Sequence, residues 1–187
     1  MTYDIVLAGF GGQGVLFLGK MIALAGMLDG KEVSWIPSYG PEMRGGTANC
    51  SVVVSDRRVG TPVVAHPNVL VAMNRPSLEK FEAKMQAGGE LLINKTLIEI
   101  PHTRTDVKAT YLEITGIAGE LGNPRLANIV ALGGLIGRTG LVTRESVIEA
   151  LKKELSGKKA ALLDLNVKAL EAGQAGVMPV GPASVPA

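Results

Sequence analysis

The chain has 187 residues and a formal net charge of +2, and its 19 Lys and Arg are spread along the sequence. Without a basic block or basic residues interleaved with aromatics, it lacks the pattern of a nucleic-acid-binding protein. The single cysteine, Cys50, excludes an internal disulfide framework and any zinc or iron–sulfur site built from several cysteines of this chain.

The composition favours one closely packed α/β domain. Hydrophobic residues make up 47% of the chain and charged residues only 19%, with 24 glycines. Because the chain is so apolar, we expect a partner to cover part of its surface. No signal peptide precedes the first predicted strand, and the apolar runs are strand-sized or interrupted by glycine. We therefore expect no membrane span and a cytoplasmic protein.

The chain opens with a predicted strand at residues 3–8, a glycine-rich turn and a helix at residues 15–28. Gly9, Gly11 and Gly14 fit the G-x-G-x-x-G template in the strand–turn–helix context that the template requires. Such a turn lacks Cβ atoms, so a phosphate or another backbone can approach the helix N-terminus. The template alone does not separate ligand binding from packing.

A second predicted strand at residues 32–36 completes a βαβ unit and bears on dinucleotide binding. An NAD site needs an acidic residue at the end of this strand, but Trp35-Ile36-Pro37 stands there and Glu32 lies at its start. The sequence therefore argues against NAD.

The segment Gly14-x4-Gly19-Lys20-Met21 nearly matches an ATP-binding P-loop. Met21 replaces the Ser or Thr that would hold Mg²⁺, and Gly19-Lys20 is predicted inside a helix. We expect Gly19 to serve close packing instead.

The loop Ser38-Tyr39-Gly40-Pro41-Glu42-Met43-Arg44-Gly45-Gly46 follows the second strand, at the edge of the sheet where ligands bind. Arg44 supplies a planar cation beside two glycines whose N–H groups are free to turn toward an anion. Alternatively, Glu42 and Arg44 form a structural ion pair and the glycines only relieve crowding.

The remaining segments predict more strands and helices of an α/β fold. Residues 48–55, a turn at 56–58 and a return strand at 63–64 are expected to form an antiparallel hairpin. Further strands are predicted at 68–73, 90–94 and 108–113, and helices at 74–88, 114–121, 123–138, 145–155 and 160–172.

Together these elements predict a Rossmann-like, mostly parallel sheet flanked by helices, with the β-hairpin as an addition. We expect one domain over residues 1–175 and a flexible C-terminal tail at 176–187.

Three glycines interrupt the predicted helix at 123–138, namely Gly133, Gly134 and Gly137. Each lowers helix propensity, a cost that is tolerable where another backbone packs directly on the helix. This helix is therefore expected in the core or at an interface.

No catalytic constellation is present in the sequence. His66 and His102 both lie in loops beside proline, and nucleophile-elbow, zinc and thiamine-binding motifs are absent. We expect no catalytic residue and no metal ligand in this chain, which suggests a subunit of a larger enzyme.

The motif Gly9-Phe10-Gly11-Gly12-Gln13-Gly14, followed about thirty residues later by the loop at 38–46, resembles the gamma subunit of 2-oxoacid:ferredoxin oxidoreductases. These enzymes act on pyruvate, 2-oxoglutarate or 2-oxoisovalerate. The resemblance covers residues 1 to about 175 and includes weaker matches at 126–128 and 170–173.

The resemblance implies an oxidoreductase complex that decarboxylates a 2-oxoacid on thiamine diphosphate, reduces ferredoxin through iron–sulfur clusters and forms an acyl-CoA. Thiamine diphosphate, magnesium, the clusters and coenzyme A then lie on or with the alpha, beta and ferredoxin-like delta chains. None is expected to be bound by this chain alone.

Carried to this sequence, the resemblance implies a site that either contacts coenzyme A or docks onto the thiamine-binding chains. Its residues are Gly11, Gly12, Gln13, Gly14, Tyr39, Glu42, Arg44, Gly45 and Gly46. The alternative is a free-standing nucleotide-binding or regulatory Rossmann-like domain. A homodimer of the isolated chain is also compatible with its apolar composition.

Overall fold

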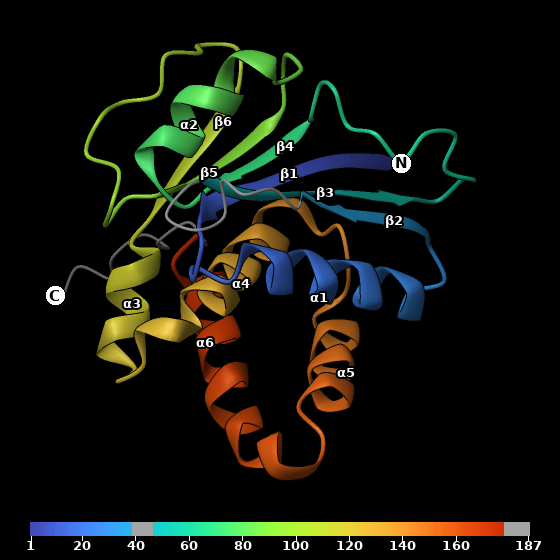
Figure 1. Cartoon of the computed structure of the whole chain (residues 1–187), viewed down its shortest axis with the longest axis vertical. Helices are drawn as coiled ribbons and strands as arrows, with labels where there is room; N and C mark the ends of the chain where they lie inside the picture. Colours follow the sequence, from blue (N-terminus) through green and yellow to red (C-terminus); the bar gives the residue numbers. More distant parts are fainter. Residues whose placement is uncertain (39–46, 178–187) are drawn as a thin grey trace, which may run out of the picture.

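The computed structural model describes residues 1–38 and 47–177, in which six strands form one sheet (Figure 1). The spatial order is β2-β3-β1-β4-β5-β6. Strands β1, β4, β5 and β6 are parallel neighbours, while β3 runs antiparallel to both β1 and β2. The strands are β1 Thr2–Phe10, β2 Glu32–Pro37, β3 Thr47–Ser55, β4 Val69–Ala72, β5 Glu90–Asn94 and β6 Lys108–Leu112.

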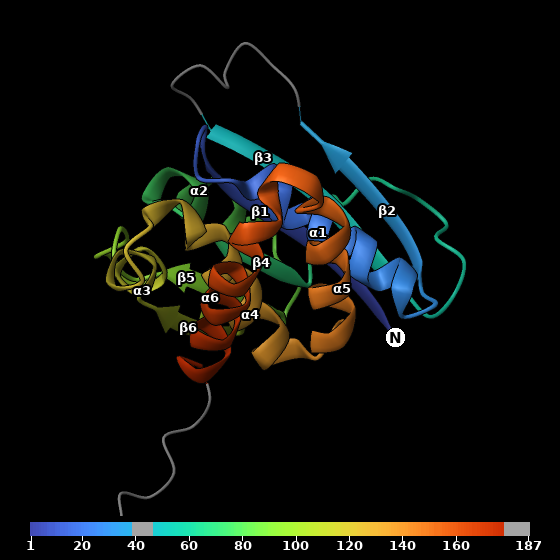
Figure 2. The same cartoon turned by 90° about the horizontal axis from the view of Figure 1, so that it is seen from below.

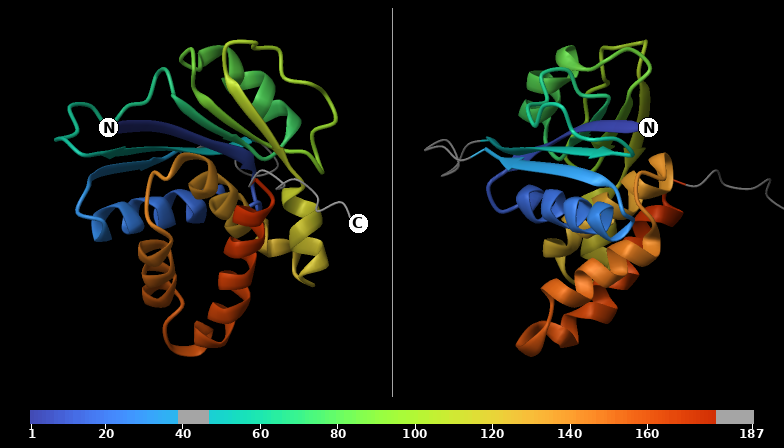
Figure 3. Two further views of the ribbon diagram at one scale, coloured as in Figure 1. Left: turned by 180° about the vertical axis from the view of Figure 1, so that it is seen from behind. Right: turned by 90° about the vertical axis from the view of Figure 1, so that its right-hand side faces the viewer.

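Helices cover the sheet unequally on its two faces. The face below the sheet in Figure 1 carries α1, α3, α4, α5 and α6, and Figure 2 shows these helices in front of the strands. In residues 1–38 and 47–177, the other face is covered by α2, η2 and connecting segments (Figure 3). The helices are α1 Val15–Leu28, α2 Arg75–Phe81, α3 Ile114–Glu120, α4 Ala127–Thr139, α5 Arg144–Glu154 and α6 Leu163–Ala175, with 3-10 turns η2 Glu82–Lys84, η3 Pro124–Leu126 and η4 Gly157–Leu162.

Strand β1 lies at the centre of the sheet because both of its faces are apolar. Ile5 and Leu7 pack in the larger core under the helices, while Val6 and Ala8 pack in the smaller core beneath α2. Alternate side chains of a strand point to opposite faces, so a strand buried on both sides needs apolar residues throughout. The mostly parallel α/β fold expected from these runs is confirmed.

The glycines of α4 allow another helix backbone to pack directly on it, as predicted. A Cβ atom placed on Gly133 would lie 2.0 Å from the carbonyl oxygen of Leu170 in α6. Reciprocally, a Cβ on Gly173 of α6 would lie 2.0 Å from the carbonyl oxygen of Val130. Since α4 is buried almost all round between α6 and the sheet, it is a core helix.

The predicted hairpin of residues 48–55 and 63–64 is wrong. Strand β3 pairs with β1 along one edge and with β2 along the other, and residues 63–64 belong to no strand. Both edges of β3 are therefore occupied, so no ladder is left for a return strand. For the same reason β2 is not the neighbour of β1, and the antiparallel addition consists of β2 and β3.

No helix within residues 1–38 and 47–177 is long and apolar enough to cross a bilayer. Most of the tail expected at 176–187 lies outside the described residues, which stop at Val177.

Candidate functional site

The glycine-rich turn lies where the direction of the chain through the sheet reverses. After β1, the chain passes through α1 to β2 on one side of the sheet, whereas β4 follows on the other side of β1. In open α/β sheets, ligands bind at such a switch point, outside the carboxyl ends of the strands. The site therefore begins with residues 11–14 and with the first residues after β4.

The Gln13 side chain bridges the carboxyl ends of β1 and β4. Its amide nitrogen donates to the carbonyl oxygen of Met73 at 3.2 Å. Its amide oxygen accepts from the backbone N–H of Phe10 at 2.6 Å and from the side-chain amide of Asn74 at 3.2 Å. An amide oxygen has two lone pairs, so its accepting capacity is used within the protein.

Packing explains two glycines of the motif. A Cβ on Gly9 would lie 2.6 Å from the amide oxygen of Gln13, and a Cβ on Gly14 would lie 2.5 Å from the amide nitrogen of Asn128 in α4. Gly14 also has φ +73°, in the left-handed region that favours glycine. Gly9 and Gly14 thus make room for two amide side chains, those of Gln13 and Asn128.

The N-terminus of α1 has no capping side chain among the described residues. Gly14 is the N-cap, and the first turn of α1 contains no acidic residue. The first-turn N–H groups of a helix lack intrahelical partners, and its dipole favours negative charge at this end. Gly11 and Gly12 are exposed beside it, so this end of α1 is chemically suited to an anion.

Buried asparagines extend the network along the same edge of the sheet. The Asn74 side chain accepts from the N–H of Ser77 and caps α2, while Asn94 donates to the carbonyl oxygen of Met73 at 3.1 Å and to the Thr115 hydroxyl at 2.9 Å. Our sequence interpretation missed Asn74, which contacts Gln13, as a residue of the site, and it missed Asn94 as a buried support of Met73. Their signal was an amide residue at or just after the end of successive parallel strands.

The P-loop alternative is not supported by the geometry. Gly19 and Lys20 lie inside α1, and the Lys20 ammonium contacts both carboxylate oxygens of Glu154, at 2.7 and 2.8 Å. A Cβ on Gly19 would lie 2.6 Å from the sulfur of Cys50, so Gly19 serves close packing. Burial raises the pKa of the Cys50 thiol to about 12, which keeps it protonated and unreactive.

The two histidines lie outside this site and bond within the chain. His102 contacts the Tyr111 hydroxyl through Nδ1 at 2.9 Å, and His66 contacts the carbonyl oxygen of Lys84 at 3.3 Å. In the part of the chain that the structure describes, no group of three or more His, Cys, Asp or Glu could hold a metal ion.

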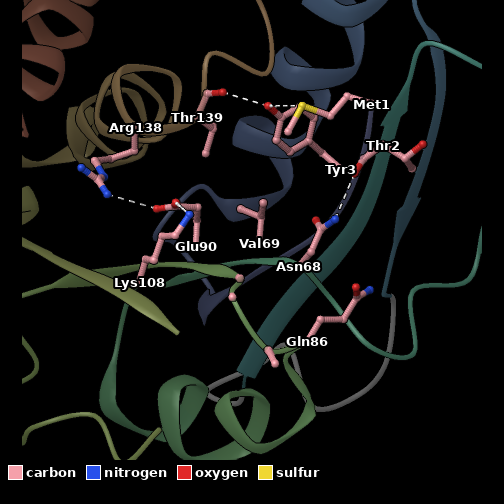
Figure 4. A pocket seen from close by; sticks show the side chains of 13 residues that line it. Met1, Thr2, Tyr3, Asn68, Val69, Gln86, Glu90, Lys108, Arg138 and Thr139 are labelled. Carbon is pink, nitrogen blue, oxygen red and sulfur yellow. Dashed lines mark hydrogen bonds and ion pairs between the residues drawn. The ribbon is translucent and has the colours of Figure 1, made fainter. Parts of the chain in front are cut away.

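A separate groove of about 460 Å³ lies at the opposite end of the strands from the glycine-rich turn, among their amino ends (Figure 4). Glu90 contacts both cationic side chains of the groove lining, Arg138 at 3.3 Å and Lys108 at 3.5 Å. The Tyr3 hydroxyl donates to the carbonyl oxygen of Thr139 at 2.9 Å. The groove shares no residue with the glycine-rich turn.

The other predicted site residues, Tyr39, Glu42, Arg44, Gly45 and Gly46, lie outside the described residues. The two ends of their segment are described. Thr47 pairs with Phe10, and Ser38 donates its N–H to the carbonyl oxygen of Asn49 at 3.0 Å. Ser38 and Thr47, which flank this segment, therefore lie at the same end of the sheet as the glycine-rich turn.

Comparison with known proteins gives concordant matches. The sequence profile of the family described as "Pyruvate ferredoxin/flavodoxin oxidoreductase" matches residues 4–175. The ketoisovalerate oxidoreductase subunit VorA of Methanothermobacter thermautotrophicus is 44% identical over 171 residues, which are 90% of this chain and 35% of VorA. The chain thus spans about a third of that relative.

Two further relatives match over most of their own length. The 2-oxoglutarate synthase subunit KorC of Methanocaldococcus jannaschii is 36% identical over 154 residues, covering 81% of this chain and 82% of KorC. The crystal structure of a keto/oxoacid ferredoxin oxidoreductase gamma subunit from Geobacter sulfurreducens PCA superimposes with a TM-score of 0.80 at 30% identity. It covers 94% of this chain and 98% of that one.

Proposed function

The chain belongs to the pyruvate ferredoxin/flavodoxin oxidoreductase family, and from this we propose that it acts as the gamma subunit of a 2-oxoacid:ferredoxin oxidoreductase. The observation that carries the proposal is the match over nearly the whole of a solved gamma subunit, 98% of that chain. The proposed complex oxidatively decarboxylates a 2-oxoacid to an acyl-CoA and CO₂ and reduces ferredoxin.

In this proposal, the chemistry is carried out on partner chains. Thiamine diphosphate, magnesium and the iron–sulfur clusters are held by alpha, beta and ferredoxin-like delta subunits, through which ferredoxin is reached. The composition supports this division, since the only cysteine of this chain, Cys50, is buried with a raised pKa. A cytoplasmic location of the complex belongs to the same proposal.

The glycine-rich turn is proposed to dock onto the thiamine-binding chains. Gly9 and Gly14 are accounted for by internal packing, and the amide oxygen of Gln13 is saturated within the chain. What remains outward is backbone and an apolar ring, because Gly11 and Gly12 are exposed and the Phe10 side chain is 41% exposed. Such a surface suits contact with another protein.

A second role, contact with coenzyme A, is favoured by one observation. The N-terminus of α1 has no capping side chain among the described residues, so its N–H groups are available to a phosphate. Arg44 would add a planar cation from the neighbouring loop. The alternative of a free-standing nucleotide-binding regulator is disfavoured by the family membership.

Arg44→Ala tests the two roles in the complex purified through a tag on this chain. Loss of the partner chains from the purified material supports docking. Unchanged assembly with a raised KM for coenzyme A and an unchanged kcat supports the coenzyme A role. If assembly and kinetics both match the wild type, the assignment of the loop residues to the site is wrong. Turnover with pyruvate, 2-oxoglutarate and 2-oxoisovalerate identifies the substrate.

A further inference from the structure

In the part of the chain that the structure describes, few contacts hold residues 10–12 of the glycine-rich turn in shape apart from those of the Gln13 side chain. A Cβ on Gly12 would meet nothing within 4 Å, and the backbone hydrogen bond that closes the turn is the 3.2 Å contact from the Gln13 N–H to the carbonyl oxygen of Phe10. Glycine backbones are conformationally permissive, so such a turn samples many shapes unless a contact restrains it. In the described residues, the Gln13 amide supplies that restraint at the Phe10 end of the turn, and the Asn128 amide donates to the Gly14 carbonyl oxygen at 3.4 Å at the other end.

Gln13 ties the turn to a rigid part of the sheet. Its partner Met73 directly follows β4, is fully buried and donates its own N–H to the carbonyl oxygen of Ala8 in β1. Its partner Asn74 is 2% exposed and is fixed by its bond to the Ser77 N–H. The turn is thus anchored to groups that have little freedom to move.

We propose that Gln13 is a positioning residue, which holds the turn so that Phe10, Gly11 and Gly12 face outward in the shape that the partner chains bind. The inference rests on the proposed function and deepens it. A surface held in its bound shape before association loses less conformational freedom on binding. Gln13 acts through the backbone of the turn and touches neither substrate nor cofactor.

Asn94 supplies a matched control, because it shares the Met73 carbonyl with Gln13. The two amide nitrogens lie 3.1 Å and 3.2 Å from the same oxygen. Asn94 is fully buried and bonds to Thr115 of α3, away from the turn. Weakening Asn94 therefore tests general stability, whereas weakening Gln13 tests the shape of the turn.

Gln13→Glu removes the donor to Met73 at nearly unchanged side-chain size. Its carboxylate still accepts from the Phe10 N–H and the Asn74 amide, and the N-terminus of α1 favours its negative charge, so it is expected to be ionised near neutral pH. The ionised carboxylate has no donor and places a negative oxygen against the Met73 carbonyl, where the wild type has a hydrogen bond.

The experiment measures binding of this chain to the remaining chains of the purified complex by biolayer interferometry at neutral pH. Gln13→Glu and Gln13→Met both lose the donor to Met73, and each is expected to bind about tenfold more weakly than the wild type. Asn94→Asp is expected to lower the melting temperature and leave the dissociation constant unchanged.

Two results would overturn the inference: wild-type affinity of both Gln13 variants, or an equal loss of affinity in Asn94→Asp at matched stability. Melting followed by fluorescence of the single tryptophan, Trp35, establishes that each variant is folded. Failure of the wild-type chain to bind the other chains would instead contradict the proposed function itself, so the two failures are distinguishable.

Discussion

Replacing Gly133 by alanine is expected to force α4 and α6 apart. The new Cβ would lie 2.0 Å from the carbonyl oxygen of Leu170 and 3.0 Å from the backbone nitrogen of Gln174. An ordinary carbon–oxygen contact is more than an ångström longer than the first of these distances. Because both obstacles are backbone atoms of a helix, no side-chain rotation can relieve the overlap.

The size of the effect follows from two opposing contributions. Overpacking a well-packed core costs about 1–3 kcal/mol, and a clash with rigid backbone belongs at the upper end. Alanine returns about 1 kcal/mol of helix propensity relative to glycine. We therefore expect Gly133→Ala to lose about 2 kcal/mol, which corresponds to a fall in melting temperature of about 4–8 °C for a chain of this size.

Gly119→Ala is the matched control, since Gly119 lies in α3 and a Cβ there would meet nothing within 4 Å. This variant is expected to be unchanged or more stable by up to about 1 kcal/mol. The assay is urea unfolding followed by Trp35 fluorescence, with the slope compared between variants. Equal stabilities of the two variants would refute the close backbone contact between α4 and α6.

Three further predictions concern single side chains. Since burial raises the pKa of Cys50 from 9.0 to about 12, its contribution to stability is complete below pH 9.0 and is lost as the pH rises toward 12. Cys50→Ala is therefore expected to reduce alkaline unfolding, measured by circular dichroism. In the wild type, iodoacetamide is expected to label native Cys50 far more slowly than unfolded Cys50 at about pH 8. Burial opposes ionisation of Asp29, but hydrogen bonds led by Ser146 and Thr143 outweigh it and lower the Asp29 pKa below 3.8. The stability from Asp29 is thus complete above 3.8 and is lost as the pH falls below it, and Asp29→Asn is expected to flatten this acid limb in a pH titration of urea unfolding. Lys20→Met removes a partly exposed ion pair and is expected to change the free energy of unfolding by less than about 1 kcal/mol, with no ATP binding by calorimetry before or after the change.

Local signals in the sequence predicted the helices and most of the strands. Thr143 and Asn74 were recognisable as helix starts, and both side chains accept the expected capping hydrogen bond, from Ser146 and Ser77 respectively. The run at 90–94 forms a strand with the predicted bounds. Such features depend on neighbouring residues, so they can be inferred without knowing the fold.

The order of the strands could not be inferred in this way. The insertion of β3 between β1 and β2 depends on pairing between residues far apart, such as Thr2 with Ser55. Val63 and Val64 resemble a strand locally, but no edge of β3 is available to them. The pairing of β3 with β1 and β2 therefore overrides the local preference of residues 63–64 for a strand.

The candidate site was only partly predictable for the same reason. The glycine spacing pointed to the turn, but the partner of Gln13 is the carbonyl of Met73, sixty residues away. The predicted contact of Gln13 with a ligand or a partner chain stays a prediction, and the structure shows the bonds of its amide within the chain. Whether Arg44 and its neighbours complete the site stays a prediction, because they lie outside the described residues.

The most direct test is 2-oxoacid-dependent ferredoxin reduction in the presence of coenzyme A, measured with this chain alone, with the other chains of the complex alone and with both combined. We expect no turnover by the isolated chain and full turnover only when it is combined with the others. Turnover by the isolated chain, or full turnover by the others without it, would contradict the assignment of this chain as a non-catalytic but required subunit.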